Sequence, residues 1–575
     1  MPSVPDLSRL IPLSARTVLF AGHGLNQLGA AYRRFNPTAR LFALDTGPEP
    51  TPGGPFEARA TMYPGLPLNL PSGPPPGPDP LADTPLSFSV PDGFDCIVYS
   101  APLEDLDDPF ALLAHHARQL APDGTILIRV HNPECWTHAR GLLTGAPQSE
   151  TPARWLRLED MSAGLATAGL IAVDVQLEES PDPEGAAVIE AIAPGLHNRG
   201  IEPAAYARTA LPRYYIWRAR KQPVRRMAIA GDMLRPIGGV SHLRVLHPLA
   251  AMATDPATIT RLAPIDNPPD LGATLGNPDG PDTAPRVFIL HRPGLFGERG
   301  QALIDGLIAR GWLVITEFDD NPDHMPGMTA PGLVSFAGVH AIQTTTPVLA
   351  DLLRQRNPEL AMFPNAIAEL PDIRNFTDPG ELTVFFGALN REQDWRPIMG
   401  PINAIARRLG DRLRFRVVHD EGFFLALETT RKTFTPLCDY DTYLDLLGTS
   451  EISLMPLDDT PFNRAKSDLK FIEAGACRVA TLASTVVYRH SVADGETGLL
   501  FDGPESFHRQ FLRLAAIPDL ALNIGDNARR MVERERMLAD QVAPRLAWYR
   551  DLWHRRAELT EALRARAARA VRPAA

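Results

Sequence analysis

Short apolar runs alternate with helix-like segments along the first 221 residues of the chain. The apolar runs predict strands at 17–21, 40–45, 95–100 and 125–130, and the segments between them predict helices at 25–35 and 109–120. This alternation is typical of a parallel sheet covered by helices on both faces. The stretch from Thr46 to Gly93 is so rich in proline and glycine that it predicts an irregular excursion.

The same alternation continues in two further units that meet near residue 375. Predicted strands lie at 225–231, 287–292 and 312–318 in the first unit, and at 382–389, 413–419, 452–457 and 479–484 in the second. Two such units fit a pair of Rossmann-like domains that face a cleft. We therefore predict an α/β protein of three Rossmann-like domains followed by a helical tail, with bounds at 1–222, 223–376, 377–550 and 551–575. The arginine-rich end predicts either a solvated helix or a basic helix on acidic lipid.

Composition and charge narrow the possible partners. Apolar residues make up 44% and charged residues 22% of the 575 residues, which is typical of a globular protein. The formal charge of −11 and the lack of a long basic run argue against a nucleic-acid partner. Four widely separated cysteines predict buried thiols in a reducing compartment. With no secretion signal and no apolar stretch long enough to span a membrane, we expect a cytoplasmic protein, and peripheral contact at the inner face of the membrane stays open.

The first domain carries a glycine turn at the end of its first predicted strand. Gly22 and Gly24 can bring the backbone close to a cofactor, and Asp45, at the end of the next strand, can hold ribose hydroxyls. This order, together with the segment FDCIVYSAPLEDLDDPFALLAHHARQLAPDGTILIRVHN, resembles class I S-adenosylmethionine-dependent methyltransferases. The resemblance implies an S-adenosylmethionine site at those three residues.

Departures from the methyltransferase pattern lead us to expect no methyl transfer. The family usually has an acidic residue in the first strand and a third glycine in the loop, where this chain has Phe20 and Asn26. The proline-rich excursion replaces the region that normally supplies an adenine contact. We expect a structural or acceptor-positioning remnant.

Small and charged residues follow the predicted strands of the second domain. Because the carboxyl ends of parallel strands meet at one sheet edge, these residues are expected to line one cleft. They are Gly238, Gly239, His242, Arg292, Asp319 and Asp320. A carboxylate here can accept a proton from an acceptor hydroxyl, so the candidate catalytic residues are Asp319, Asp320 and His242. A plain turn capped by Ser241, and turn formation by the DDNP sequence, explain the same residues structurally.

A strand-to-helix loop opens the third domain. Gly387, Asn390 and Arg391 can present backbone amides and a guanidinium to a diphosphate. An ordinary turn with a solvated arginine is the structural alternative.

A second anion site is predicted further along the third domain. Lys466 and Ser467 stand at the predicted start of a helix, where free amides and a cation combine. Glu473, about two turns further on, can receive ribose hydroxyls. Helix capping by Ser467 or Asp468, with Glu473 at the surface, is the structural alternative.

The segment from 462 to 501 resembles the retaining glycosyltransferases of the two-domain B fold, which use sugar nucleotides. Many members carry two glutamates separated by seven residues, a small-residue turn, a strand ending in a small polar residue and a D-G-x-x-G-L-L run. This chain has Glu473, AGA, VATLAS and DGETGLLF in these places, but Ala465 replaces the first glutamate.

The resemblance spans about 227–550 and has consequences for further residues. It implies that Asn365 lies at the cleft edge. Because Ala465 replaces a glutamate, it also implies that contacts with the donor sugar come from Asn463, Lys466 or Asp468.

The activity implied is the transfer of a hexose or deoxyhexose from a UDP, GDP or dTDP sugar to a glycan, lipid-linked or protein acceptor. The family suggests bacterial surface polysaccharide or glycoconjugate assembly as the setting. Cationic side chains and helix amides can stabilise the leaving diphosphate, so we expect neither a metal ion nor a separate cofactor. The alternatives are a bifunctional methyltransferase-glycosyltransferase and a non-catalytic scaffold that binds sugar nucleotides or glycans.

Overall fold

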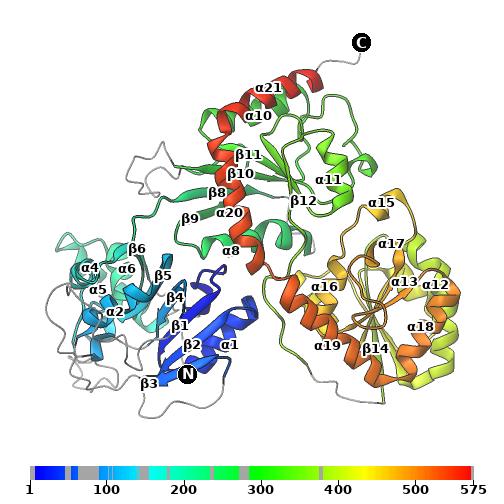
Figure 1. The fold of residues 1–575 in the computed structure, drawn as a ribbon, viewed down its shortest axis with the longest axis horizontal. Helices are drawn as coiled ribbons and strands as arrows, with labels where there is room; N and C mark the ends of the chain where they lie inside the picture. Colours follow the sequence, from blue (N-terminus) through cyan, green and yellow to red (C-terminus); the bar gives the residue numbers. More distant parts are fainter. Residues whose placement is uncertain are drawn as a thin grey trace. The chain divides into compact units, whose positions relative to one another are not determined.

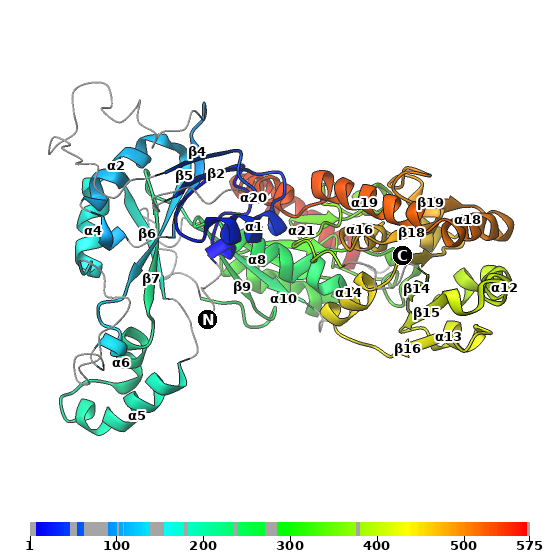
Figure 2. The ribbon, with the colours of Figure 1, turned by 90° about the horizontal axis from the view of Figure 1, so that it is seen from below.

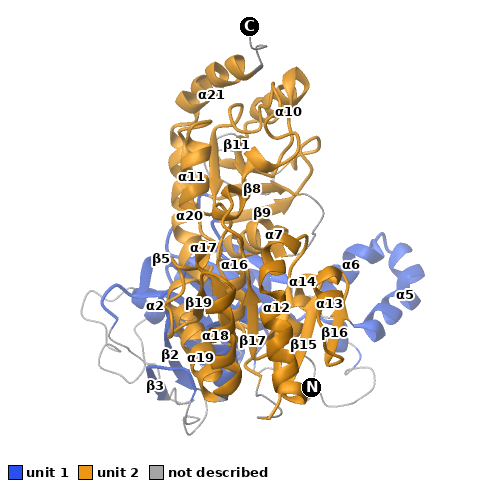
Figure 3. Cartoon of the chain, turned by 90° about the vertical axis from the view of Figure 1, so that its right-hand side faces the viewer, with its two compact units in different colours: residues 1–33, 38–225, 254–257 blue, residues 34–37, 226–253, 258–575 orange. Residues whose placement is uncertain are grey.

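The computed structural model describes residues 7–45, 54–61, 90–100, 103–106, 108–138, 140, 154–177, 182–233, 239–270, 284–374 and 380–571. The chain forms two compact units (Figure 3). Unit 1 comprises Met1–Arg33, Thr38–Arg225 and Thr254–Ala257, and unit 2 comprises Arg34–Pro37, Arg226–Ala253 and Thr258–Ala575. The predicted second and third domains therefore lie in one compact unit.

Unit 1 is built on a seven-stranded sheet in the order β3-β2-β1-β4-β5-β7-β6. Neighbouring strands are parallel, except that β7 runs antiparallel to both β5 and β6. The strands are β1 Thr17–Gly22, β2 Arg40–Asp45, β3 Ala58–Thr61, β4 Phe94–Tyr99, β5 Leu120–His131, β6 Ile171–Leu177 and β7 Tyr214–Arg220. The helices are α1 Leu25–Phe35, α2 Pro109–Gln119, α4 Leu158–Thr167, α5 Pro183–His197 and α6 Pro203–Ala210.

The apolar pattern explains the central strands of unit 1. Strands β1 and β4 lie in the middle of the sheet and are almost wholly buried, as a strand covered on both faces must be. Strand β3, the described strand of the proline-rich excursion, lies at the sheet edge, where proline and glycine are tolerated. Positions 46–53 and 62–89 of that excursion lie outside the described residues. Helices α5 and α6 pack against each other (Figure 2).

The first half of unit 2 is a six-stranded parallel sheet in the order β13-β12-β11-β10-β8-β9 (Figure 1). Its strands are β8 Met227–Asp232, β9 Thr258–Leu262, β10 Arg286–His291, β11 Leu313–Glu317, β12 Ala341–Thr344 and β13 Leu360–Met362. Its helices are α7 Gly239–Ser241, α8 His247–Ala253, α10 Gly297–Ala309 and α11 Pro347–Arg354. A π-helical turn, His242–Leu246, joins α7 to α8, and such turns are frequent at functional sites.

The second half of unit 2 is a six-stranded parallel sheet in the order β16-β15-β14-β17-β18-β19, the strand order of a dinucleotide-binding sheet. Its strands are β14 Leu382–Gly387, β15 Leu413–Val418, β16 Lys432–Thr435, β17 Ile452–Met455, β18 Ala480–Ser484 and β19 Leu499–Phe501. Its helices are α12 Glu392–Leu409, α13 Glu421–Ala426, α14 Tyr440–Gly448, α15 Pro461–Arg464, α16 Leu469–Ala476, α17 Thr485–Tyr488, α18 Pro504–Ala516 and α19 Pro518–Glu535.

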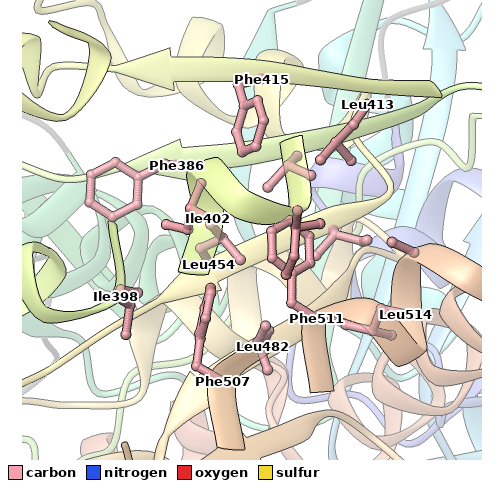
Figure 4. Packing of buried hydrophobic residues seen from close by; sticks show 14 of the residues in the cluster. Phe386, Ile398, Ile402, Leu413, Phe415, Leu454, Leu482, Phe507, Phe511 and Leu514 are labelled. Carbon is pink, nitrogen blue, oxygen red and sulfur yellow. The ribbon is translucent and has the colours of Figure 1, made fainter. Parts of the chain in front are cut away.

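The core of this second half lies between the sheet and two of its helices. Figure 4 shows strand residues packed against α12 and α18: Phe386, Leu413, Phe415, Leu454 and Leu482 meet Ile398, Ile402, Phe507, Phe511 and Leu514. Burial of such side chains is the main favourable term in folding. The predicted α/β class with three Rossmann-like sheets is confirmed.

The two last helices, α20 Ala539–His554 and α21 Arg556–Val571, return to the first half of unit 2 (Figure 1). The Tyr549 hydroxyl donates to Gln343 Oε1 at 2.8 Å. Leu559 and Leu563 on α21 are buried. The prediction of a solvated tail is therefore wrong for this face of α21, because its leucines pack as core residues. None of the helices in the described ranges is long and apolar enough to cross a membrane.

Candidate functional site

A cavity of about 190 Å³ lies between the two halves of unit 2. One side of it follows the carboxyl ends of β10, β11 and β13, and the other is formed by β14, β17 and the start of α16. Four cationic side chains line it: Arg292, Arg391, Lys466 and Lys470. Among the described residues of its lining, Asp319 supplies the one carboxylate. The lining thus carries more cations than carboxylates, which suits it to an anion, although carboxylates in or just behind the lining pair with Arg292, Arg391 and Lys466.

Arg391 is held at the cavity by a network at the start of α12. The preceding residue, Asn390, is exposed and has a φ of 56°, a left-handed conformation that asparagine tolerates. The Arg391 guanidinium donates to Asn463 Oδ1 at 2.8 Å and to Asp394 Oδ2 at 3.1 Å. Asn463 Nδ2 donates in turn to Asp394 Oδ1 at 2.7 Å. The network therefore fixes a cation beside the amino end of a long helix.

Two contacts join the halves of unit 2 beside the cavity. Lys466 Nζ donates to both carboxylate oxygens of Asp320, at 2.8 and 2.9 Å. Asn365 Nδ2 donates to Ser467 Oγ at 2.8 Å. As predicted, Lys466 and Ser467 come just before a helix, α16. The structure thus brings together residues that the sequence suggested for separate sites.

Lys470 and Glu473 lie near each other on α16, and the charge of each affects the pKa of the other. Lys470 lines the cavity and donates to the carbonyl oxygen of Gly387. Glu473 is 3% exposed, accepts a hydrogen bond from the Tyr440 hydroxyl at 2.9 Å and does not belong to the described lining. Burial lowers the pKa of Lys470 to about 8, against the charge of Glu473. Burial raises the pKa of Glu473 to about 7, against the charge of Lys470. The alternative of a surface Glu473 is wrong.

Asp319 is bound to Arg292 inside the cavity wall. Arg292 Nε donates to Asp319 Oδ1 at 2.6 Å, and Arg292 has a φ of 48°, which is uncommon outside glycine. Burial alone raises the pKa of Asp319, but the charge and hydrogen bond of Arg292, together with the nearby His291, outweigh burial and hold that pKa well below its usual range. His291 Nε2 lies 3.8 Å from Asp319 Oδ1, too far for a hydrogen bond. Asp319 is therefore an anion throughout the neutral pH range.

A buried ion pair supports the first-half wall of the cavity. Arg244, in the π-helical turn, donates from Nε and Nη2 to the two carboxylate oxygens of Glu317, at 3.0 Å each. Its Nη1 donates to Asn365 Oδ1 at 3.0 Å. The side chains of Arg244 and Glu317 are only 1% and 0% exposed. This pair orients the amide of Asn365, which in turn reaches Ser467.

Three of the remaining predicted residues, His242, Gly239 and Gly387, pack against aromatic rings. The His242 ring stacks on Tyr440, with ring centroids 5.2 Å apart. A Cβ on Gly239 would lie 2.7 Å from the Tyr440 ring, so glycine permits that close approach. Gly387 lines the cavity, but a Cβ there would lie 2.6 Å from the Phe385 ring, so packing also requires this glycine. Gly238 lies outside the described residues.

The residue that replaces the first glutamate of the family pattern is buried. Ala465 is 0% exposed and packs in the core of the first half. Among the three residues expected to contact the donor sugar instead, Asn463 belongs to the Arg391 network. Asp468 accepts a hydrogen bond from Arg536 at 2.8 Å. Only Lys466 of the three belongs to the described lining of the cavity.

One predicted cofactor residue of unit 1, Asp45, is bound by a side chain of the same unit. Arg59 Nη1 donates to both oxygens of Asp45, at 3.0 and 2.7 Å, and Arg59 Nη2 donates to Asn26 Oδ1. Phe56 packs edge-on against Phe20, with centroids 5.8 Å apart. Gly22 and Gly24 do have left-handed φ values of 137° and 65°. Arg59 therefore occupies the carboxylate that was expected to hold the ribose of S-adenosylmethionine.

Sequence reasoning assigned no role to Lys470, Tyr440 or Arg244. Lys470 and Glu473 are three positions apart on a predicted helix, a spacing that places side chains side by side and is therefore a usable signal. No local signal marks Tyr440 or Arg244, whose partners are remote in sequence. No group of three or more histidine, cysteine, aspartate or glutamate side chains arranged for a metal ion occurs within the described ranges.

No protein-family model and no curated protein matches the chain in sequence. Sucrose-phosphate synthase from Thermosynechococcus elongatus is 15% identical, with a TM-score of 0.39 over 57% of this chain and 100% of that one. HepE from Anabaena, solved with UDP-glucose, is 12% identical, with a TM-score of 0.40 over 56% and 99%. A mutant of TarM from S. aureus, solved with UDP, is 10% identical, with a TM-score of 0.36 over 47% of this chain and 55% of TarM. The match thus spans about half the length of TarM. Similarity at this level does not assign the chain to a family.

Proposed function

We propose that unit 2 is a glycosyltransferase that holds the diphosphate of a nucleotide sugar in the cavity between its halves. The observation that carries the proposal is the convergence of Arg292, Arg391, Lys466 and Lys470 on this cavity. The starts of α12 and α16 adjoin the same space, and helix amino ends favour phosphate. The resemblance of residues 462–501 suggests a UDP, GDP or dTDP sugar as donor and a glycan, lipid-linked or protein acceptor in surface glycan assembly.

In the proposed reaction the anomeric carbon of the donor sugar exchanges its bond to the diphosphate for a bond to the acceptor. The bond to the diphosphate oxygen breaks, and the diphosphate leaves with the electron pair. A bond to the acceptor oxygen forms, and the acceptor hydroxyl loses its proton. Fixed cations such as Arg391 and Lys470 stabilise the charge that develops on the leaving group.

The carboxylates of the first half differ in their fitness as proton acceptors. Asp319 is better suited to orient Arg292, because a group whose pKa lies far below neutral is a weak base. Asp320 is the candidate base once Lys466 no longer holds both of its oxygens. His242 is also a candidate base, but its ring is stacked on Tyr440 and has to reach the acceptor hydroxyl from there.

Donor binding has to widen the cavity. Pockets for small ligands usually measure about 300–1,000 Å³, more than the 190 Å³ of this cavity. The Lys466–Asp320 and Asn365–Ser467 contacts hold the two halves together beside it. We propose that Lys466 leaves Asp320 and binds the donor diphosphate instead. Donor binding then breaks the Lys466–Asp320 contact and leaves the Asp320 carboxylate unpaired.

Thermal unfolding of the full chain in the presence of UDP, GDP, dTDP or S-adenosylhomocysteine tests the proposal. A ligand that binds only the folded protein adds about 2.7 kcal/mol to the free energy of unfolding when its concentration is a hundred times its Kd. The unfolding midpoint rises as a result. We expect one nucleoside diphosphate to raise the midpoint. The matching nucleotide sugar should then release its nucleoside diphosphate when acceptors are supplied. An unchanged midpoint with all three diphosphates would contradict the proposed site.

Binding of the diphosphate should weaken as the pH rises from 7 to 9. Lys470, whose pKa burial lowers to about 8, carries its positive charge below that pH and loses it above. Glu473, whose pKa burial raises to about 7, gains a negative charge over the same range. We expect Kd to rise about tenfold, since one pH unit above the pKa leaves about a tenth of the lysine charged. Titration calorimetry at each pH measures this, and a constant Kd would show that Lys470 does not meet the phosphate.

A non-catalytic scaffold that binds sugar nucleotides is the second candidate function. The burial of Ala465, where related enzymes have a glutamate, favours it, because that position offers the donor sugar no polar contact. Binding of a nucleotide sugar without release of its nucleoside diphosphate, across a broad acceptor panel, would support the scaffold over the enzyme.

For unit 1 we propose a methyltransferase-like fold without its cofactor. The sheet order, with β7 antiparallel between β5 and β6, supports the resemblance in fold. The Arg59–Asp45 pair opposes cofactor binding. S-adenosylhomocysteine should therefore leave the unfolding midpoint unchanged, and a rise would favour the bifunctional alternative.

A further inference from the structure

A second and larger cavity, of about 700 Å³, lies in the first half of unit 2. It is bordered by the amino ends of β10 and β11, where Arg286 and Leu313 begin the strands, and by α20 and α21. The proposed donor cavity is bordered instead by residues after the carboxyl ends of the same strands. The two cavities therefore lie at opposite edges of one sheet, and the second is independent of the proposed transfer.

The lining of this second cavity is strongly basic. Its basic members are Arg286, Arg310, His554, Arg556 and Arg564. His340 also lines it, but burial lowers its pKa to about 4, so it adds no positive charge. Glu561 is the one acidic residue among the described residues that line it. The side chains of Arg310 and Arg564 are exposed and make no ion pair or hydrogen bond with the described part of the chain. Such a concentration of positive charge, in a protein of net charge −11, suits this cavity to an anion.

Helix α21, which carries Arg556 and Arg564, is attached to the sheet by hydrogen bonds. His340 Nδ1 accepts a hydrogen bond from the backbone of Val314 at 2.9 Å, so its Nε2 is the nitrogen that can donate to Thr560 Oγ1, 3.1 Å away. Arg566 donates to the carbonyl oxygen of Val339 at 2.9 Å. These contacts fix α21 across the cavity, so the helix that carries Arg556 and Arg564 is in place before a ligand arrives.

The floor of the cavity adds an apolar and aromatic surface. Trp312 and Trp553 line it and are largely buried. The Arg556 guanidinium lies 4.3 Å from the centre of the Trp553 ring, a cation–π distance that keeps the guanidinium at the cavity. A volume of about 700 Å³ also falls in the usual range for small-ligand pockets.

We propose that this cavity binds a phosphate group carried by a larger molecule. Arginine forms paired hydrogen bonds with phosphate oxygens and is favoured wherever a phosphate is recognised. The same chemistry is offered by the headgroup of an anionic phospholipid and by a soluble phosphorylated metabolite. The proposal covers the phosphate contact that both share, with Arg310 and Arg564 as the residues that provide it.

The test compares the full chain with the double variant Arg310→Ala/Arg564→Ala. Calorimetry with inorganic pyrophosphate probes the soluble source, and saturating nucleoside diphosphate is present in each titration to occupy the proposed donor cavity. Co-sedimentation with vesicles of phosphatidylcholine, pure or mixed equally with phosphatidylglycerol, probes the lipid source. Both side chains are exposed, so the variant should fold normally. The matched control is Arg534→Ala/Arg569→Ala, which removes two exposed arginines that do not line the cavity.

We expect the double variant to bind at least one probe about tenfold more weakly than the wild-type chain, and the control to bind within about twofold of it. Loss of vesicle binding alone identifies a lipid headgroup as the source, and loss of pyrophosphate binding alone identifies a soluble phosphate. An equal loss in the control would overturn the proposal, because diffuse charge would then explain the binding. Absence of wild-type binding to both probes would overturn it as well.

Discussion

Replacing Lys470 with methionine is expected to raise the Kd for the nucleoside diphosphate about 100-fold. The substitution keeps the shape of the side chain and removes the cation that lines the donor cavity. A hydrogen bond to a charged group contributes about 1.5–3 kcal/mol, and 1.4 kcal/mol corresponds to a factor of ten in Kd. The fold should persist, because Glu473 can take up a proton when its partner is removed. Titration calorimetry measures the change.

Lys432→Met is the matched control for this variant. Lys432 lies in the same half of unit 2 and donates to the carbonyl oxygens of Phe424 and Leu427, at 2.8 and 2.7 Å. It does not line the cavity. Its replacement should leave the Kd unchanged. Equal effects in the two variants, or none in Lys470→Met, would remove Lys470 from the proposed site.

Replacing Arg244 with methionine is expected to lower the free energy of unfolding of unit 2 by about 3–5 kcal/mol. The change leaves the carboxylate of Glu317 in an interior where it is 0% exposed and loses the bond to Asn365. An unpaired buried charge costs far more than the loss of a surface pair. Denaturation followed by tryptophan fluorescence measures the effect, since Trp312, Trp395 and Trp553 belong to unit 2.

Two further variants separate the buried charge from general damage. Arg407→Ala removes an exposed pair with Glu428 and should cost less than about 1 kcal/mol. Adding Glu317→Gln to Arg244→Met removes the unpaired charge of Glu317. The double variant should recover part of the lost free energy of unfolding. A loss in Arg244→Met no larger than in Arg407→Ala would contradict the assigned role of the ion pair.

The elements of the fold were largely predictable from the order of apolar residues. The predicted helix at 25–35 is α1, and the predicted strands at 40–45 and 479–484 coincide with β2 and β18 to within one residue. Central strands of parallel sheets are buried on both faces, so their sequences are continuous apolar runs that can be recognised locally. The return of α20 and α21 to the first half was not predictable, because the partners of those helices lie far away in the sequence.

Three of the cations that line the cavity were predicted from the sequence, whereas Lys470 and the pairings were not. Lys466, Arg292 and Arg391 were singled out by their positions after strands or before helices, and all three line the cavity. The partner of Lys466 is Asp320, 146 positions away, and no local pattern links the two. The burial of Glu473 beside Tyr440 was likewise not predictable, because it results from the packing of α14 against α16.

The sequence by itself determined the α/β class, the three sheets and the sheet edge at which charged residues gather, because strand burial and helix starts are local properties. Only the tertiary structure decided which charges neutralise one another. Arg59 closes Asp45 in unit 1, and Lys466 pairs with Asp320 in unit 2, whereas Lys470 stays at the cavity with a lowered pKa. The physical reason is that burial and ion pairing depend on distances in space between residues that are remote along the chain.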